Sequence, residues 1–170
     1  MNHKSTIQIR HSEPEDIPAI KALYAEPSCY AGTLQQPFAS EQMWQNRLKE
    51  PQANFISLVA IGGYEDGEEL LGQLGMEIFT HPRRKHVANM GMAVSEQHRN
   101  QGVARTLLAS AIDTAENWQA VTRIELEVYT DNPAALKLYQ NHGFEIEGRA
   151  KNYAYRSGEY VDVYLMARIT

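Results

Sequence analysis

Cysteine is nearly absent from this chain of 170 residues, in which Cys29 is the only one. A single cysteine excludes an internal disulfide and a metal centre built from several thiolates. Positive charge is also scarce: 16 Lys and Arg residues stand against 21 Asp and Glu residues, for a net charge of -5 with histidine neutral. Nucleic-acid binders usually carry a concentrated basic face, so no nucleic-acid partner is expected.

Long apolar runs are missing as well. No uncharged apolar run approaches the roughly 20 residues of a membrane span, and Met1 to Arg10 lacks the apolar core of a signal peptide. We therefore expect a cytoplasmic protein with no membrane partner. The six histidines include no pair at the i, i+4 spacing of a helical zinc site, so no metal is predicted. Hydrophobic residues make up 43% and are spread along the chain, which predicts one globular domain over residues 1–170.

Hydrophobic periodicity predicts an alternation of strands and helices that begins with a strand around Ile7 to His11 and a helix up to Tyr24. Pro27 should end that helix and begin a loop through Ala39, before a second helix at Glu41 to Leu48. The later expected elements are strands at Phe55–Ile61, Leu70–Phe79 and His86–Val94, a helix from Val103 to Ala115, a strand at Arg123–Val128, a helix ending at Gly143, and strands at Phe144–Tyr155 and Glu159–Arg168. Turns are expected at Gly62-Gly63, Asp66-Gly67, His81-Pro82 and Ser157-Gly158.

The segment Arg99-Asn100-Gln101-Gly102-Val103-Ala104 lies between a predicted strand and a predicted helix. Such a turn presents free backbone N–H groups and the positive end of a helix dipole, which together favour a phosphate or diphosphate. Gly102 permits close approach of the backbone, and Arg99 adds a charge-assisted contact. A Walker loop is excluded because Lys and Ser or Thr do not follow Gly102. An ordinary strand-to-helix turn is the alternative for this segment by itself.

The helix that ends at Gly143 carries the second candidate group. Asn132 can cap this helix and Pro133 fits its first position. Tyr139 follows Asn132 by about two helical turns, so the two residues lie along one side and Tyr139 is a candidate to face a ligand. A tyrosine packed in the core is the alternative.

Together these two segments resemble the GCN5-related N-acetyltransferase (GNAT) family. Its members share an Arg/Gln-x-x-Gly-x-Gly/Ala turn, followed by an Asn and by a Tyr-x-x-x-Gly-Phe helix exit, which appear here as Arg99 to Ala104, Asn132, and Tyr139 with Gly143-Phe144. The resemblance implies an α/β (α+β) fold: a mixed, mostly antiparallel sheet of about seven strands, splayed in the middle and flanked by about four helices. It also implies an acetyltransferase that uses acetyl-coenzyme A and no metal.

The resemblance further implies a role for each matched residue. The backbone of Met92, Ala93 and Val94 should bind the pantetheine arm. The diphosphate should lie on the turn that comprises Arg99, Asn100, Gln101, Gly102, Val103, Ala104 and Arg105. Asn132 would contact the cofactor arm, and Tyr139 would protonate the departing thiolate. Glu127 resembles the general base of the branch that acetylates ribosomal proteins, while a plain surface carboxylate and the rival base Glu77 remain alternatives.

Three stretches resemble bacterial family members that acetylate L-amino acids: Thr33–Pro37, His81–His86 and Gly158–Tyr164. This implies a small-molecule amine as acceptor, the α-amino group of a free amino acid such as phenylalanine or methionine. The family places its acceptor pocket where this chain has Tyr30, Phe38, Tyr153, Tyr155 and Tyr160. Acetylation of a polyamine or of a ribosomal-protein N-terminus is the enzymatic alternative, and a non-catalytic acyl-coenzyme A sensor is the alternative of another class. A homodimer is also expected.

Overall fold

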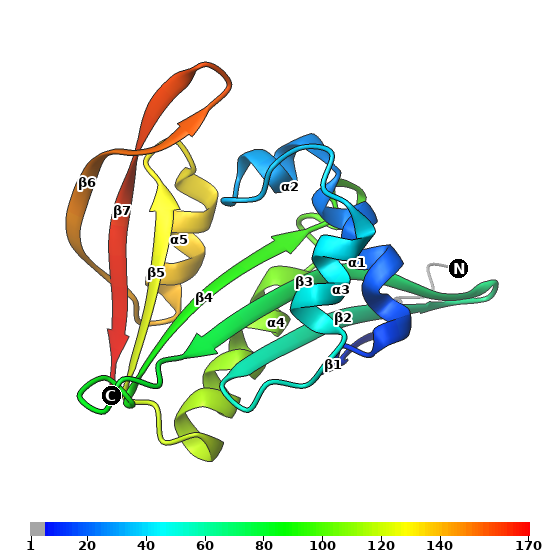
Figure 1. The fold of residues 1–170 in the computed structure, drawn as a ribbon, viewed down its shortest axis with the longest axis horizontal. Helices are drawn as coiled ribbons and strands as arrows, with labels where there is room; N and C mark the ends of the chain where they lie inside the picture. The colour runs from blue at the N-terminus through cyan, green and yellow to red at the C-terminus, as the bar shows by residue number, and fades with distance from the viewer. Residues whose placement is uncertain (1–5) are drawn as a thin grey trace. The chain divides into compact units, whose positions relative to one another are not determined.

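A computed structural model describes residues 6–170 of the chain, which form a mixed sheet and the helices around it (Figure 1). Across these residues the hydrogen-bonded strand order is β1-β2-β3-β4-β5-β7-β6. The strands are β1 (Ile7–His11), β2 (Phe55–Tyr64), β3 (Gly67–Ile78), β4 (Val87–Val94), β5 (Arg123–Tyr129), β6 (Glu145–Arg156) and β7 (Glu159–Ile169). The seven strands confirm the predicted fold class.

Five α-helices accompany the strands over the described residues. They are α1 (Ile17–Tyr24), α2 (Pro27–Ala31), α3 (Glu41–Leu48), α4 (Val103–Asp113) and α5 (Pro133–Asn141). Short 3-10 helices precede α1 at Pro14–Asp16 and α4 at Glu96–His98, and a π-helical turn at Thr114–Trp118 follows α4. Two compact units contain these elements: the first unit comprises the described residues up to Gly75 and Met92–Ala111, and the second comprises Met76–Gly91 and Ile112–Thr170.

The first unit buries both faces of its sheet. Every residue of β2 from Ile56 to Ile61 is buried, as expected for a strand covered on both sides. Val59 and Ile61 pack with α1 and α3, where the rings of Tyr24 and Trp44 stack at 4.9 Å between centroids. On the opposite face α4 lies against β3 (Figure 1). The first unit therefore holds the start of α4 against a rigid sheet.

In the second unit β5 pairs with β4 in parallel and with β7 in antiparallel fashion. The parallel register covers Val87–Asn89 with Arg123–Glu125, whereas the antiparallel register extends along the whole of β5. The predicted splay in the middle of the sheet stays a prediction. β6 and β7 form a hairpin whose turn has positive φ at Ser157 (51°) and Gly158 (87°), as predicted for a tight hairpin turn.

Two expectations at the level of local structure were wrong. The stretch after Pro27 is not a continuous loop, because Pro27 begins α2 at the first helical position, where its missing N–H costs nothing. This short helix raises the number of α-helices from the expected four to five. Gly62-Gly63 is not a turn: Gly62 pairs with Ile7 of β1, so β2 continues to Tyr64 and the chain turns at Glu65-Asp66 instead.

Candidate active site

The candidate diphosphate turn of the first unit begins α4. The backbone N–H of Thr106 donates to the carbonyl oxygen of Gly102 at 3.0 Å, which is a helical hydrogen bond four residues back along the chain. The Thr106 hydroxyl donates to the same oxygen at 2.8 Å. The amides of Val103, Ala104 and Arg105 therefore lie in the first turn, where a helix offers its N–H groups no partner of its own. These free N–H groups and the helix dipole together favour negative charge at this position.

Positive φ angles shape this turn at Asn100 (60°) and at Gly102 (86°). A β-carbon added to Gly102 would meet only the Arg105 side chain, at 3.8 Å. Glycine is thus required by the backbone conformation, and the space around it is open to a ligand. This fits the diphosphate of coenzyme A, which needs close access to main-chain amides.

Packing inside the first unit fixes the height of α4 above the sheet. A β-carbon on Gly72 of β3 would lie 2.9 Å from the carbonyl oxygen of Ala93, 3.2 Å from Leu107 and 3.3 Å from Val103. Any larger residue at position 72 would push α4 and β4 away from β3. Upstream of the turn, buried His98 bonds to Glu69 with 3.0 Å between Nε2 and Oε1, which anchors the Glu96–His98 turn to β3.

The predicted pantetheine edge, Met92 to Val94, is the last part of β4. Ala93 is buried, and Met92 and Val94 are half-buried. The Cys29 thiol donates weakly to the Val94 carbonyl with 3.5 Å between Sγ and O. Burial raises the pKa of this thiol to about 11, and the charge of Glu26 adds to the rise, so Cys29 remains a protonated thiol near neutral pH.

Asn132 caps α5 in the second unit as predicted. Its side-chain oxygen accepts a hydrogen bond from Ala135 N at 3.1 Å, and Pro133 occupies the first helical position. The cap engages the oxygen of the Asn132 amide. Its contact with the cofactor arm stays a prediction.

Tyr139 is buried in α5, with 8% of its surface exposed. Its ring packs edge-on against Phe144, with 5.7 Å between centroids. Burial raises the pKa of the phenol to about 12, so the group is protonated throughout the neutral range. A neutral phenol is the form that a general acid needs.

Glu127 projects from β5 and is exposed. Asn89 of β4 donates from Nδ2 to its carboxylate, at 3.2 Å from Oε1 and 3.4 Å from Oε2. Burial raises the pKa of the Tyr153 phenol on β6. The negative charge of Glu127 is the second cause of this rise, and Tyr129 is a smaller one. The structure thus brings the Glu127 carboxylate and the Asn89 amide together in the second unit, and the carboxylate charge acts on the Tyr153 phenol. The rival base Glu77 is also exposed, near the end of β3.

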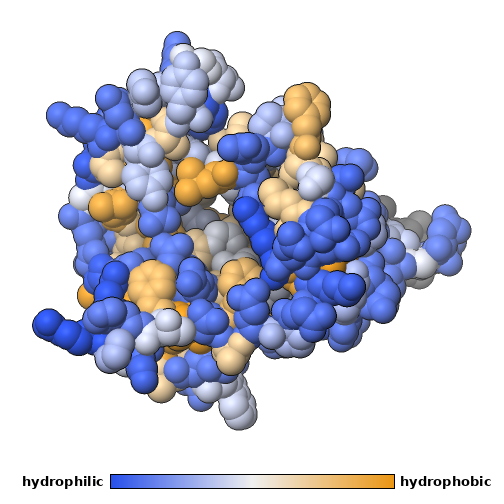
Figure 2. All heavy atoms as spheres, in the orientation of Figure 1, coloured by the Kyte–Doolittle hydropathy of each residue, from blue (hydrophilic) through white to orange (hydrophobic). Residues whose placement is uncertain are grey.

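The aromatic residues predicted for the acceptor pocket are mostly exposed. Phe38 is fully exposed, Tyr155 and Tyr160 are 66% and 67% exposed, and the last two rings meet edge-on at 5.0 Å across the β6–β7 hairpin. The view in Figure 2 shows a largely hydrophilic surface on which hydrophobic residues are scattered in small groups. Exposed aromatic rings are available to a ligand with an apolar side chain.

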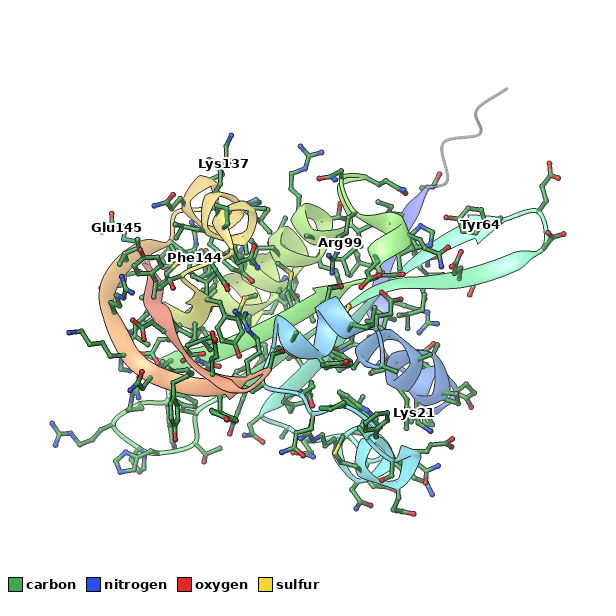
Figure 3. All side chains as sticks on the ribbon, turned by 90° about the horizontal axis from the view of Figure 1, so that it is seen from above. Lys21, Tyr64, Arg99, Lys137, Phe144 and Glu145 are labelled. Atoms are coloured by element: carbon green, nitrogen blue, oxygen red, sulfur yellow. The ribbon has the colours of Figure 1, made fainter. Side chains whose placement is uncertain are left out.

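Sequence reasoning missed several residues around these positions. Asn89 is the one amide side chain in the otherwise apolar strand β4, and this isolated polar position was visible in the sequence. Arg156 of β6 stacks 4.7 Å over the Tyr129 ring and pairs with Asp131, next to the cap residue Asn132. Ser28 bonds to the predicted turn residue Arg99, whose side chain is labelled in Figure 3. No local pattern links Ser28 to that turn.

The order of these strands and helices, with a glycine-containing turn between β4 and α4, is the one expected of an acetyltransferase. The chain belongs to the Acetyltransferase (GNAT) family, whose sequence profile matches residues 19–144. It is 44% identical over 165 residues to the L-amino acid N-acetyltransferase AaaT of Escherichia coli (strain K12), and the alignment covers 97% of this chain and 99% of that protein.

Solved structures agree with this assignment. An acetyltransferase of the GNAT family from Streptococcus pneumoniae superimposes with a TM-score of 0.82 at 27% identity, covering 97% of this chain and 100% of the other. Spermidine N-acetyltransferase from Vibrio cholerae, solved in complex with CoA and spermine, shares the fold with a TM-score of 0.83 at 24% identity, covering 96% of this chain and 95% of the other.

Residues 6–170 contain no cluster of three or more His, Cys, Asp and Glu side chains arranged to hold a metal ion. Among their helices, none combines the length and the hydropathy needed to cross a bilayer.

Proposed function

We propose that this enzyme transfers the acetyl group of acetyl-coenzyme A to the α-amino group of a free L-amino acid. The observation that carries the choice of acceptor is the identity of 44%, over nearly the full length of both chains, with a protein named as an L-amino acid N-acetyltransferase. The family assignment and the open, positive-φ turn at Gly102 support acetyl-coenzyme A as the donor.

In this proposal the first-turn amides of α4 bind the diphosphate, and Arg99 adds a positive charge. The Met92–Val94 backbone pairs with the pantetheine arm, and Asn132 contacts that arm through its remaining amide nitrogen. Main-chain N–H groups of β4 stabilise negative charge on the thioester oxygen as the amine attacks. The cofactor supplies the activated acetyl group.

The proton transfers are assigned to two side chains. Glu127 takes a proton from the substrate ammonium, directly or through a water, and the Asn89 amide keeps its carboxylate in place. The neutral amine nitrogen then bonds to the acetyl carbon, the carbon–sulfur bond breaks, and the leaving thiolate takes the Tyr139 proton. The new amide nitrogen releases its second proton to solvent, and Glu127 also returns its proton to solvent. The phenolate then regains a proton from solvent. Attack is direct, so Cys29 needs no role as a nucleophile. Glu77 is the rival base.

Thiol release from acetyl-coenzyme A, measured with a panel of acceptors, tests the substrate class. We expect L-phenylalanine and L-methionine to be acetylated, with their N-acetylated forms as blanks. A spermidine N(1)-acetyltransferase of Vibrio cholerae is 33% identical to this chain over 76 residues, so spermidine belongs in the panel with a peptide that begins with alanine. Faster turnover of spermidine or of the peptide would refute the amino-acid assignment. Binding of acetyl-coenzyme A with no turnover of any amine would favour the sensor.

The remaining parts of the proposal concern the whole protein. We propose that the two compact units form a single GNAT domain, since the family match extends from residue 19 to residue 144 and thus enters both. A cytoplasmic location and a homodimer stay predictions. Light scattering in solution measures the molecular mass and therefore tests the homodimer.

A further inference from the structure

The start of α2 is bonded to the chain just before the candidate diphosphate turn. Both oxygens of the Glu26 carboxylate accept hydrogen bonds there: Oε1 from the Ser95 hydroxyl at 2.9 Å and Oε2 from the Glu96 amide at 2.8 Å. Ser95 N donates in turn to Leu71 O of β3 at 2.9 Å. The two residues that follow β4 are therefore fixed on two sides within the first unit.

Ser28, two residues further along, occupies a position between two charges. Its hydroxyl donates to Glu96 Oε1 at 2.5 Å, and its backbone N–H reaches the same oxygen at 3.3 Å. The hydroxyl oxygen accepts a hydrogen bond from Arg99 Nη2 at 2.7 Å. A serine hydroxyl has one proton and two lone pairs, so both of these roles are compatible. Glu96 thus orients the Ser28 proton, and one of the two lone pairs of the hydroxyl oxygen accepts from Arg99.

The Ser28 hydrogen bond also lowers the pKa of Glu96, with the Arg99 charge as a smaller cause. Glu96 is therefore ionised at neutral pH and accepts from Ser28 across the pH range of an assay. Exposed polar contacts of this kind stabilise a fold little. These contacts do restrict the rotamers of Arg99, a long side chain that loses considerable conformational entropy when it becomes ordered.

We propose that Ser28 is a positioning residue of the cofactor site, which holds the Arg99 guanidinium ready to meet the diphosphate of acetyl-coenzyme A. This inference rests on the proposed function, because it assumes that Arg99 contacts the cofactor. It adds a residue of α2 that lies outside the family turn and is separated from it by 71 positions in the sequence. Ser28 acts through Arg99 and touches no reacting atom.

The direct test is calorimetric titration with acetyl-coenzyme A. We expect Ser28→Ala to weaken binding about fivefold, the loss that corresponds to one hydrogen bond of ordinary strength. Ser28→Thr retains the hydroxyl and should restore most of the affinity. Ser40→Ala is the matched control, because Ser40 caps α3 in the same unit through Met43 N at 3.2 Å. It should lower the melting temperature without changing cofactor affinity.

A double-mutant cycle separates positioning from a general structural effect. In an Arg99→Ala background, Ser28→Ala should cause no further loss of affinity. The loss should also be confined to ligands with the diphosphate: coenzyme A should inhibit the Ser28→Ala variant less well, while pantetheine should inhibit the variant and the parent equally. An equal loss from Ser28→Ala with and without Arg99 would overturn the proposal.

The other outcomes are also distinguishable. If Arg99→Ala binds acetyl-coenzyme A as tightly as the parent, Arg99 does not contact the cofactor, and the inference fails while the proposed acetyl transfer stands. If Arg99→Ala weakens binding but Ser28→Ala does not, only the role of Ser28 is refuted. Absence of heat with the parent protein would refute the proposed function and this inference together.

Discussion

Replacing Gly102 by alanine separates the backbone requirement of the cofactor turn from its role in binding. Gly102 has a φ of 86°, and an added β-carbon would meet only Arg105, at 3.8 Å. The added methyl therefore causes no serious clash, and the expected cost is that of a left-handed L-residue, about 1–2 kcal/mol. For a chain of this size each kcal/mol lowers the melting temperature by about 2–4 °C.

Gly158 in the β6–β7 turn is a matched control. Its φ of 87° is nearly the same, and an added β-carbon would meet nothing within 4 Å. Gly158→Ala should therefore lower the melting temperature by a similar amount. Only Gly102→Ala places a methyl group where the diphosphate approaches the main-chain amides, so only this variant should bind acetyl-coenzyme A at least about tenfold more weakly, a difference of about 1.4 kcal/mol.

Calorimetry measures the affinity of each variant for acetyl-coenzyme A, and thermal unfolding measures the melting temperature of each. If Gly102→Ala binds acetyl-coenzyme A as the parent does, the diphosphate does not lie on this turn and the site assignment is wrong. Equal weakening in the two variants would show that affinity follows stability alone. Either result refutes the reasoning, whatever the melting temperatures are.

Four further predictions concern Tyr139, Glu127 and Cys29. Tyr139→Phe keeps the packing against Phe144 and should lower kcat by about 100-fold or more, as loss of a general acid does, with unchanged affinity for acetyl-coenzyme A; equal kcat values would remove Tyr139 from the mechanism. Glu127→Gln should lower kcat/KM for the amine by at least about tenfold while Glu77→Gln does not, and the reverse pattern would make Glu77 the base. The Cys29 thiol should react slowly with iodoacetamide at neutral pH and rapidly in urea, because burial raises its pKa to about 11. Since that pKa lies above the ordinary value of 9.0, its contribution to stability is complete below 9.0 and is lost as pH rises through about 11; urea unfolding of the parent and of Cys29→Ala checks this, and a constant difference across the window would contradict it.

Local rules predicted the elements whose ends depend on nearby residues. Asn132, Pro133 and Gly143 define α5 because capping, ring geometry and positive φ act within a single helical turn. The Gly62-Gly63 prediction failed for the opposite reason. Pairing with β1, a segment far away in the sequence, extends β2 through both glycines and overrides their tendency to turn.

The sequence by itself determined the composition of the candidate site: a glycine-containing turn before a helix, a capped helix with a phenol, and a carboxylate on the polar side of a strand. Only the tertiary structure decided what surrounds these groups. Ser28 and Arg99 are 71 positions apart, and Asn89 and Glu127 are 38 apart. The raised pKa of the Tyr139 phenol comes from burial alone. Hydrogen bonds and desolvation depend on which surfaces meet after folding, and no short-range pattern records them.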